Sequence, residues 1–306
     1  MYGMNQVKDE ITLISGISAA LIWGLSPAFT RMLTEDLGAF AAGMFISLFG
    51  GIIALIKKQF TTGYENIKTV HKNYWIICAT SYMLFTVTSN LAVGIARTRE
   101  EVISSGIFRL LWPLMTLIMT IPINKAKVNK KFYIAVFLCF LGILITNIDN
   151  TNPSIFILMK NILMSWKACI LGLFSSICWG IYSNSYSKYV HGAKEDFIGI
   201  IMIETAMIQL IGSLLFDPAI SVQKEQINQL VFLVVCTFLG NVFWNLGLRG
   251  KYNLYVILFA NFIPIISTVI TGMILGVNIT IMMLVGSLLI VVGTIWSEKC
   301  FIGRKK

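Results

Sequence analysis

Long apolar runs separated by short polar segments dominate the pattern of this chain. Because a helix needs about 20 apolar residues to cross a hydrocarbon core of about 30 Å, each run is predicted to be a membrane-spanning helix. The ten predicted spans are 11–31, 38–56, 73–95, 102–122, 132–148, 168–187, 197–216, 229–248, 252–276 and 279–297. The stretch 149–167 is apolar but short and contains Lys160, which favours an interfacial segment over a further span.

The amino-acid composition agrees with a membrane protein. Of the 306 residues, 57% are hydrophobic and 12% are charged, and the mean hydropathy is +0.79. A soluble domain carries about 25% charged residues, so we expect little of this chain to lie outside the bilayer. The formal charge of +10 could indicate nucleic-acid binding, but the Lys and Arg residues lie at the ends of the apolar runs. The expected partners are therefore lipid and a small-molecule substrate, while the oligomeric state is open and compatible with a monomer.

The residues that usually carry catalysis or bind metals form no recognisable set. The six cysteines lie within or beside apolar runs without CxxC spacing, and we expect them to be reduced. His71 and His191 fall in predicted loops, and there is no phosphate-binding loop. An intramembrane enzyme would need paired carboxylates or a nucleophile with a base, and none is evident. The sequence predicts neither an enzyme nor a metal or cofactor site.

Positive charge is distributed unevenly between alternate loops. Seventeen cations fall on one side: Lys8, Lys57, Lys58, Lys68, Lys72, Lys125, Lys127, Lys130, Lys131, Lys188, Lys194, Arg249, Lys251, Lys299, Arg304, Lys305 and Lys306. Six fall on the other: Arg31, Arg97, Arg99, Lys160, Lys167 and Lys224. Cytoplasmic loops retain positive charge, so both termini are predicted to be cytoplasmic in a multi-pass protein of the cell membrane. This outcome requires an even number of spans, which agrees with ten.

The two halves of the chain share an ordered set of residues. The matches are Gly16 with Gly172 and Trp23-Gly24 with Trp179-Gly180 at an offset of 156, Asn90 with Asn245 at 155, and Pro113 with Pro264 and Gly142 with Gly293 at 151. The alternative is a chance coincidence in a chain rich in Trp and Gly. A repeat of five spans must enter the membrane in opposite directions in its two copies, which is typical of secondary transporters.

We therefore predict an all-α integral membrane fold. About ten transmembrane helices would form an inverted five-plus-five repeat around a central cavity. Residues 1–148 would be the first repeat, 149–167 an extracytoplasmic connector and 168–306 the second repeat.

Arg109 is the strongest single candidate for function. It stands about two turns inside the fourth predicted span, where a charge is costly unless it faces a cavity or a partner. We expect it to bind an anionic group such as a substrate carboxylate, with Asn90, Asn245 or Asn261 adding polar contacts. Alternatively, its side chain snorkels to the interface or pairs with Glu100 or Glu101. Glu204 in the seventh span could couple protons, but a hydrogen bond to Gln209 or Ser213 is the favoured interpretation, and we leave it out of the site.

Tryptophan and proline residues within the spans mark further candidates. Trp23, Trp112, Trp179 and Trp244 lie toward span interiors, although membrane tryptophans usually favour the interfaces. Lining an aqueous cavity would satisfy their N–H groups, while helix packing is the alternative. Pro113 and Pro264 are predicted hinges, because each proline removes a backbone donor and loosens the preceding turn.

Several stretches of the sequence resemble the drug/metabolite transporter superfamily, in its EamA-like branch, and within it exporters of aromatic amino acids of the YddG type. They are GISAALIWGLSPAFTRMLTEDLG in span one, EVISSGIFRLLWPLMTLIM in span four, CWGIYSNSYSKYVHG in span six, and WNLGLRGKYNLYVILFANFIP across spans eight and nine. The resemblance covers nearly the whole chain. It implies ten helices around a central cavity and outward movement of amino acids.

The resemblance also implies which residues line the cavity. These are Phe85 and Ser89 of span three, Trp112 before the proline of span four, Trp179 of span six, and Ala260 and Asn261 before Pro264. Leu110 replaces an aromatic residue that such exporters tend to carry three positions before the span-four proline. INKAKV replaces the acidic motif that many members carry after span four, so proton coupling is not implied.

These observations favour an exporter of amino acids, with aromatic or bulky neutral side chains preferred. The alternative is an exporter of another small metabolite or drug, such as a nucleoside, a purine or an amphipathic cation. The predicted substrate site comprises Tyr82, Phe85, Ser89, Arg109, Trp112, Trp179, Trp244, Asn245, Ala260 and Asn261.

Overall fold

The computed structural model is almost entirely helical. It describes residues 2–61, 63–64, 67–95, 106–146, 148, 154–190, 196–217, 222–263, 265–266, 269 and 280–302. The α-helices are α1 (Tyr2–Leu37), α2 (Ala39–Thr61), α3 (Thr80–Gly94), α5 (Trp112–Asn124), α6 (Lys131–Thr146), α7 (Ile155–Met164), α8 (Trp166–Tyr189), α9 (Ile198–Phe216), α10 (Lys224–Arg249), α11 (Asn253–Ala260) and α13 (Ile281–Lys299). A π-helical turn, Tyr74–Ala79, leads into α3, and strands β1 (Lys127–Val128) and β2 (Phe301–Ile302) pair antiparallel.

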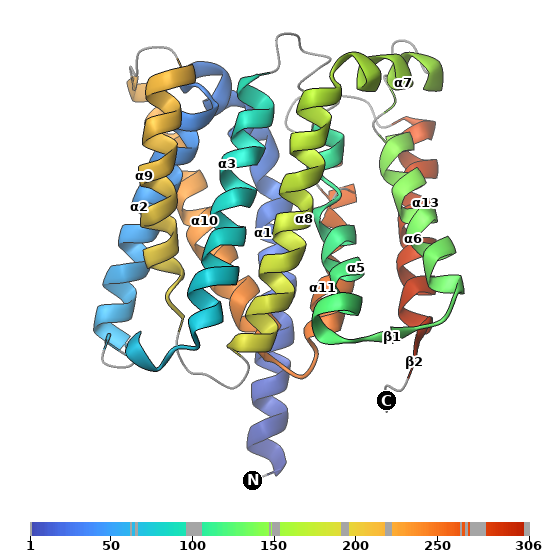
Figure 1. Ribbon diagram of the computed structural model, residues 1–306, viewed down its shortest axis with the longest axis horizontal. Coiled ribbons are helices and arrows are strands. Elements are labelled where there is room, and N and C mark those ends of the chain that lie inside the picture. The colour runs from blue at the N-terminus through green and yellow to red at the C-terminus, as the bar shows by residue number, and fades with distance from the viewer. Residues whose placement is uncertain are drawn as a thin grey trace.

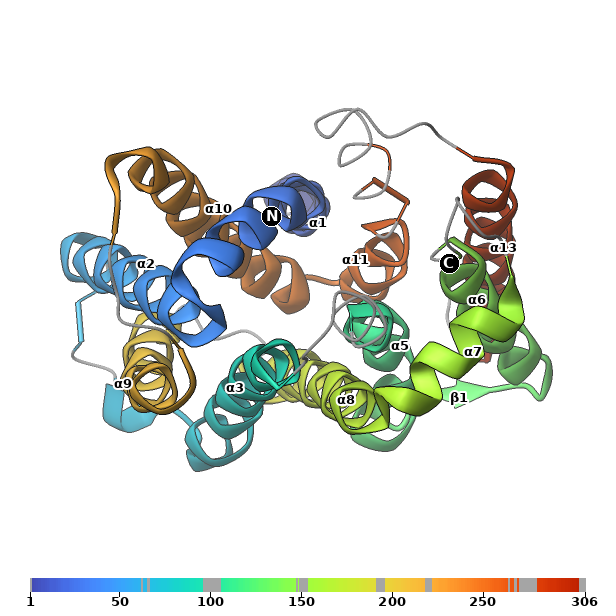
Figure 2. The same ribbon diagram turned by 90° about the horizontal axis from the view of Figure 1, so that it is seen from above.

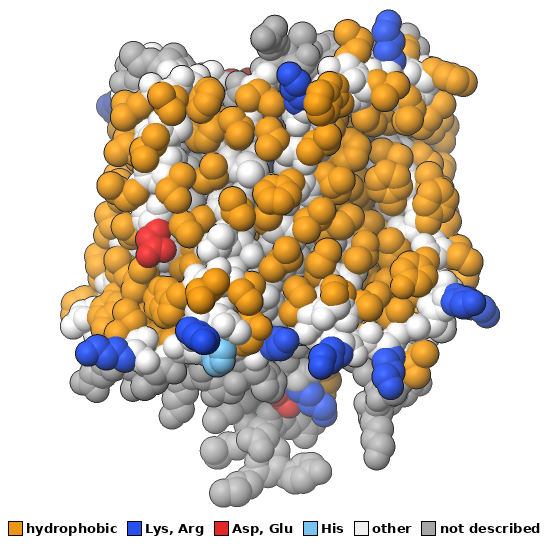
Figure 3. Space-filling model, in the orientation of Figure 1, with side chains coloured by type: hydrophobic (Ala, Val, Ile, Leu, Met, Phe, Trp, Pro, Cys, Tyr) orange, Lys and Arg blue, Asp and Glu red, His pale blue; other side chains and the backbone are white. Residues whose placement is uncertain are grey.

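Length and hydropathy suit these helices to a bilayer. Within the described residues, five helices can cross a membrane by these criteria, and a sixth span results if α7 and α8, which meet at 90°, count as one. Apolar side chains cover the middle of the molecule in a broad belt (Figure 3). The prediction of an all-α membrane protein is confirmed. The count of ten spans stays a prediction, because parts of predicted spans four and nine lie outside the described residues.

Both ends of the described chain lie at the same end of the molecule (Figure 1). In the same orientation, Lys and Arg side chains form a row along that rim, with fewer at the opposite end (Figure 3). Helix α7 lies across the opposite end, at 90° to α8 (Figure 1). This segment falls within the predicted connector 149–167.

The packing of α6 against α13 has two-fold symmetry. Gly142 of α6 faces Gly286 and Ile290 of α13, and Gly293 of α13 faces Ala135 and Cys139 of α6. At the offset of 151 that relates Gly142 to Gly293, Ala135 corresponds to Gly286 and Cys139 to Ile290. Later residues of α6 contact earlier residues of α13, and the reverse also holds, so the two helices are antiparallel. A two-fold axis that relates antiparallel spans lies in the plane of the membrane, as the inverted repeat requires.

The other helix pairs show the same symmetry, because helices of one half of the chain pack on helices of the other half. Helix α1 packs on α10 and α11, while α8, its counterpart in the second half, packs on α3 and α5. Helix α2 packs on α9, its own counterpart. Viewed from above, α1, α2, α3, α8, α5, α11 and α10 surround a central region, and α6 and α13 stand together beside it (Figure 2).

Adding a methyl group at Gly142 should separate α6 from α13. An alanine Cβ at this position would lie 2.6 Å from the carbonyl oxygen of Gly286 and 2.9 Å from the backbone nitrogen of Ile290. Backbone atoms cannot move aside as a flexible side chain does, so we expect Gly142→Ala to cost about 1–3 kcal/mol. The control is Gly106→Ala, whose Cβ meets no described atom within 4 Å. Melting temperatures in detergent test this prediction, and equal values for the two variants would contradict the close packing.

Candidate substrate site

A cavity of about 250 Å³ lies between the two halves of the chain. Its described lining comes from six helices and two helix breaks. The residues are Trp23, Ser26, Thr30 and Thr34 of α1, Ala39, Ala42, Gly43, Ile46 and Ser47 of α2, Tyr82, Phe85, Thr86, Ser89 and Asn90 of α3, Arg109 and Leu110 at the break before α5, Trp112 of α5, Trp179 of α8, Thr237 and Asn241 of α10, and Ile263 after α11. Thr34 and Ala39 flank the turn between α1 and α2, at the end of the molecule opposite the termini. The cavity therefore extends from the middle of the bundle toward that end.

A break in the helix places Arg109 at the cavity. Residues 106–109 are helical, Leu110 and Leu111 form a turn, and α5 begins at Trp112 with Pro113 in its first turn. Proline has no N–H, so the carbonyl of Arg109, four residues earlier, has no helical donor. The Ser176 hydroxyl on α8 lies 2.9 Å from this oxygen and 2.6 Å from the Phe108 oxygen and can donate to either. Hydroxyl groups from neighbouring helices commonly satisfy such carbonyls in membrane proteins.

The same break occurs in the second half of the chain. Helix α11 ends at Ala260, and Asn261 and Phe262 form a turn. At the offset of 151, these two residues correspond to Leu110 and Leu111. Of the two predicted hinges, Pro113 lies beside the first break, and Pro264 lies outside the described residues.

The Arg109 guanidinium has a single neutral hydrogen-bond partner among the described residues. Its Nη1 donates to the Ser89 hydroxyl at 3.5 Å, and no described carboxylate lies within ion-pair distance. Glu100 and Glu101, the alternative partners considered from the sequence, lie outside the described residues. None of the described lining residues is acidic. The guanidinium therefore makes this part of the cavity positive and suited to an anionic group.

Four tryptophans gather at the deep end of the cavity. The rings of Trp23, Trp112, Trp179 and Trp244 lie 5.3–6.4 Å apart, mostly edge to face. The first three line the cavity, and Phe85 lies 4.6 Å from Trp179. Aromatic rings in such arrangements offer flat apolar faces and polar edges to a ligand.

The structure brings six of the ten predicted site residues into the cavity lining: Tyr82, Phe85, Ser89, Arg109, Trp112 and Trp179. Trp244, Asn245, Ala260 and Asn261 are buried outside the described lining. The Trp244 indole donates to Ser183, and the Asn261 amide donates to the carbonyls of α11. Their proposed contact with substrate is therefore not supported by the geometry of this state.

Asn245 and Glu204 differ from what the sequence suggested. Asn245 accepts from the Tyr182 hydroxyl and donates to Asp196, so its amide is engaged away from the cavity. Glu204 is exposed on α9, whereas Gln209 accepts from Asn90 and donates to Ser47 on the other side of that helix. The expected hydrogen bond from Glu204 to Gln209 or Ser213 is not made, because Glu204 is exposed whereas Gln209 and Ser213 are buried and Ser213 has no partner among the described residues.

Sequence reasoning missed the polar wall contributed by α1 and α10. Thr30, Thr237 and Asn241 line the cavity and lie within mainly apolar runs. A small polar residue in a span gives no sign of which face it occupies. Trp23 could have been included through symmetry, since it is the repeat counterpart of Trp179 and their rings lie 5.3 Å apart.

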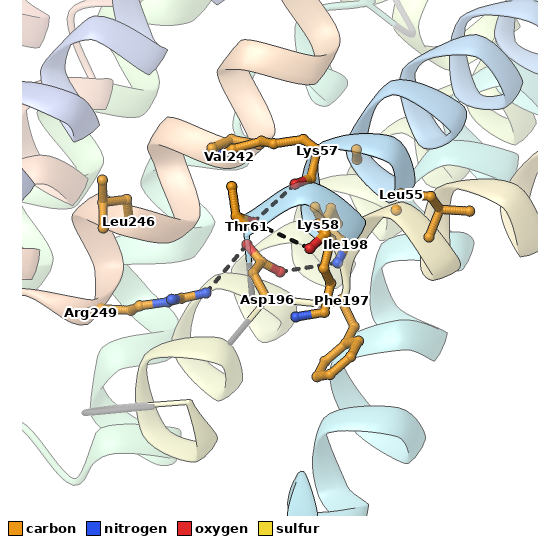
Figure 4. A pocket seen from close by; sticks show the side chains of 12 residues that line it. Leu55, Lys57, Lys58, Thr61, Asp196, Phe197, Ile198, Val242, Leu246 and Arg249 are labelled. Carbon is orange, nitrogen blue, oxygen red and sulfur yellow. Dashed lines mark hydrogen bonds and ion pairs between the residues drawn. The ribbon is translucent and has the colours of Figure 1, made fainter. Parts of the chain in front are cut away.

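The opposite end of the molecule is closed by an ion pair. Asp196, just before α9, lies 3.4 Å from Arg249 at the end of α10, and both side chains are largely buried. They line a second cavity of about 270 Å³, together with Lys57 and Lys58 of α2 (Figure 4). The Arg249 Nε donates to the Tyr186 hydroxyl at 2.9 Å.

Aromatic rings fill the space between the ion pair and the central cavity. Trp179, Tyr182 and Tyr186 follow one face of α8, with successive rings 5.3 and 5.8 Å apart. Tyr182 donates to Asn245, which in turn donates to Asp196. The described lining of the central cavity thus extends toward the α1–α2 turn, and these aromatic rings lie between that cavity and the ion pair near the termini.

A family model agrees with this architecture. The EamA-like transporter family matches residues 10–148 and 166–297, most of the chain. The chain belongs to the EamA-like transporter family. Two matched segments separated by a short gap fit the symmetric halves of the fold. The prediction of a transporter is confirmed.

Relatives of this EamA-family transporter are distant but extend over its length. It is 22% identical to the aromatic amino acid exporter YddG of Salmonella typhimurium, over 94% of this chain and 96% of that protein. It is 24% identical to the aromatic amino acid exporter YddG of Escherichia coli, with the same coverage. A crystal structure with 14% identity superposes with a TM-score of 0.75 over 93% of this chain and 95% of that one, which supports the fold.

Proposed function

We propose that this EamA-family transporter exports amino acids, preferably those with aromatic or bulky neutral side chains, by alternating access. The observation that carries the proposal is a cavity in which Arg109, the one charged residue of the described lining, stands beside aromatic walls that include Phe85, Trp112 and Trp179. The guanidinium suits the substrate carboxylate, and the rings suit an apolar side chain. The relatives named as aromatic amino acid exporters support this substrate class.

The lining also discriminates against the alternative substrates. An amphipathic cation would meet the like charge of Arg109, and the described lining offers no carboxylate to offset it. A nucleoside or purine would leave the guanidinium without an anionic partner in a partly desolvated site. A carboxylated ligand satisfies both the charge and the aromatic walls.

Transport of a solute panel tests the proposal. Everted vesicles that contain the protein would be given labelled amino acids, nucleosides and a cationic drug, with and without a proton gradient. We expect saturable uptake of phenylalanine, tyrosine or tryptophan. Uptake of only nucleosides or the drug would replace this substrate class with the alternative.

The charged rim supports a cytoplasmic location of both termini. Lys and Arg side chains gather at the end where the termini lie, and cytoplasmic segments carry this excess. On this orientation the central cavity faces outward and the Asp196–Arg249 pair closes the cytoplasmic side.

We predict that reporter fusions to the C-terminus will report a cytoplasmic location. A fluorescent protein that matures only in the cytoplasm should be bright, and an alkaline phosphatase that requires the extracytoplasmic side should be inactive. A fusion after residue 223, at the start of α10 and at the opposite end, is the control and should give the reverse pattern. Phosphatase activity at the C-terminus would overturn the orientation.

A further inference from the structure

We propose that Asn241 and the indole N–H of Trp179 form a polar subsite at the deep end of the cavity, which binds the ring hydroxyl of tyrosine. The protein would therefore transport tyrosine better than phenylalanine. This inference rests on the proposed export of aromatic amino acids and specifies which of them fits best.

The Asn241 side chain leaves a buried acceptor at the cavity. Its Nδ2 donates to the Thr237 carbonyl at 2.8 Å and to the Tyr82 hydroxyl at 3.2 Å. Because a carbonyl can only accept, the Thr237 contact fixes which end of the amide is the nitrogen. Its Oδ1 is buried and has no hydrogen-bond partner among the described residues, and the residue is 3% exposed.

The Trp179 indole supplies the complementary group. Its Nε1 is a buried donor without a partner among the described residues, and the residue is also 3% exposed. Both residues line the cavity, and both adjoin Tyr82: Asn241 bonds to its hydroxyl, and the Trp179 ring lies 6.1 Å from its ring. Buried polar groups without partners are uncommon in native proteins, and a pair of opposite kind in one cavity indicates a ligand that both donates and accepts.

The position of this pair relative to Arg109 sets the length of the ligand. Arg109 bonds to Ser89 and Asn241 bonds to Tyr82, and both of these residues lie on α3. Seven residues of helix separate them, which is about 10 Å along the axis. The carboxylate and ammonium groups of an amino acid are attached to the same carbon, so they are too close together to reach both Arg109 and Asn241.

A tyrosine molecule fits both ends. With its carboxylate at Arg109, its ring would pass between Phe85 and the tryptophans and bring its hydroxyl to Asn241 and Trp179. A phenol hydroxyl can donate to the Asn241 oxygen and accept from the Trp179 indole. The indole N–H of a tryptophan substrate would satisfy only Asn241, and the phenyl ring of phenylalanine would satisfy neither.

Competition by a series of substrate analogues tests the subsite on the unmodified protein. Uptake of labelled phenylalanine into proteoliposomes would be inhibited by tyrosine, tryptophan, phenylalanine or O-methyltyrosine. O-methyltyrosine keeps the aromatic ring and its oxygen but cannot donate to Asn241. We expect tyrosine to inhibit at about tenfold lower concentration than phenylalanine or O-methyltyrosine, with tryptophan between them.

Variants assign the preference to Asn241. In Asn241→Leu the ratio between the inhibitory concentrations of phenylalanine and tyrosine should fall toward one, whatever the uptake rate of the variant itself. Gln229→Leu is the control, because Gln229 lies on the same helix, also has an unpartnered amide oxygen, and is absent from the described lining. If phenylalanine is transported but tyrosine and O-methyltyrosine inhibit equally, the subsite is wrong and the proposed function stands. If no aromatic amino acid is transported, the proposed function itself fails.

Discussion

Replacing Arg109 by glutamine is expected to lower transport of aromatic amino acids by roughly 10- to 100-fold. A charge-assisted hydrogen bond to a carboxylate is worth about 1.5–3 kcal/mol, and glutamine keeps a polar side chain without the charge. The fold should persist, since no described carboxylate loses its partner and the backbone carbonyl of Arg109 remains bonded to Ser176. Initial uptake rates at matched membrane expression, together with melting temperatures in detergent, measure the two effects separately.

Two further variants complete that experiment. Trp112→Ala should also reduce transport, because it removes an aromatic wall of the same cavity. Lys131→Gln, an exposed residue at the start of α6, is the control for loss of a positive charge. Near-normal transport by both Arg109→Gln and Trp112→Ala would overturn the site. Collapse of Arg109→Gln expression would instead assign Arg109 to a structural ion pair.

Removing the cation of the closing ion pair should destabilise the protein. Arg249→Met leaves the Asp196 carboxylate largely buried without its 3.4 Å partner and removes the donor to Tyr186. Loss of one member of a fully buried pair costs about 3–5 kcal/mol, and partial exposure reduces this, so we expect a fall in melting temperature of roughly 5 °C. Transport should also fall, because a seal toward the termini is needed while the cavity is open at the other end.

The matched control lies two residues further along the chain. Lys251 is exposed and carries the same charge, so Lys251→Met should behave like the unmodified protein. If Arg249→Met and Lys251→Met have the same melting temperature and the same uptake rate, the ion pair does not hold this side closed.

The membrane fold could be predicted from the sequence because the lipid bilayer restricts spanning segments to long apolar helices. Spans appear as long apolar runs, and interruptions by charge are visible without any knowledge of packing. The repeat was detectable because residues at close helix contacts, such as Gly142 and Gly293, are restricted by the backbone that faces them. Ten spans could be proposed but not counted, because parts of predicted spans four and nine lie outside the described residues.

The sequence predicted part of the candidate site, but it did not predict the helix break that places the residues there. Arg109 and Trp112 both lie in predicted span four, but the helix breaks between them at Leu110 and Leu111. Both still line the cavity, because Pro113 starts a new helix whose first residue faces it. A proline in the sequence predicts a break in the helix. The direction in which the residues before it turn depends on contacts with neighbouring side chains such as Ser176.

The closing ion pair and the subsite were beyond sequence reasoning. Asp196 and Arg249 lie at the ends of different helices, and in the sequence Arg249 is simply one of many cations on its side. Asn241 is one of several amides in an apolar run, and its importance comes from an acceptor that has no partner among the described residues. Such information requires the orientation of side chains, which periodicity does not supply.

Phenylalanine counterflow tests the central claim most directly. Purified protein in liposomes loaded with unlabelled phenylalanine would be diluted into labelled phenylalanine, with protein-free liposomes and the Arg109→Gln variant alongside. We predict a transient accumulation of label that requires the protein, saturates with substrate and is strongly reduced in the variant. Absence of counterflow for phenylalanine, tyrosine and tryptophan, with folded and monodisperse protein, would contradict an exporter of aromatic amino acids.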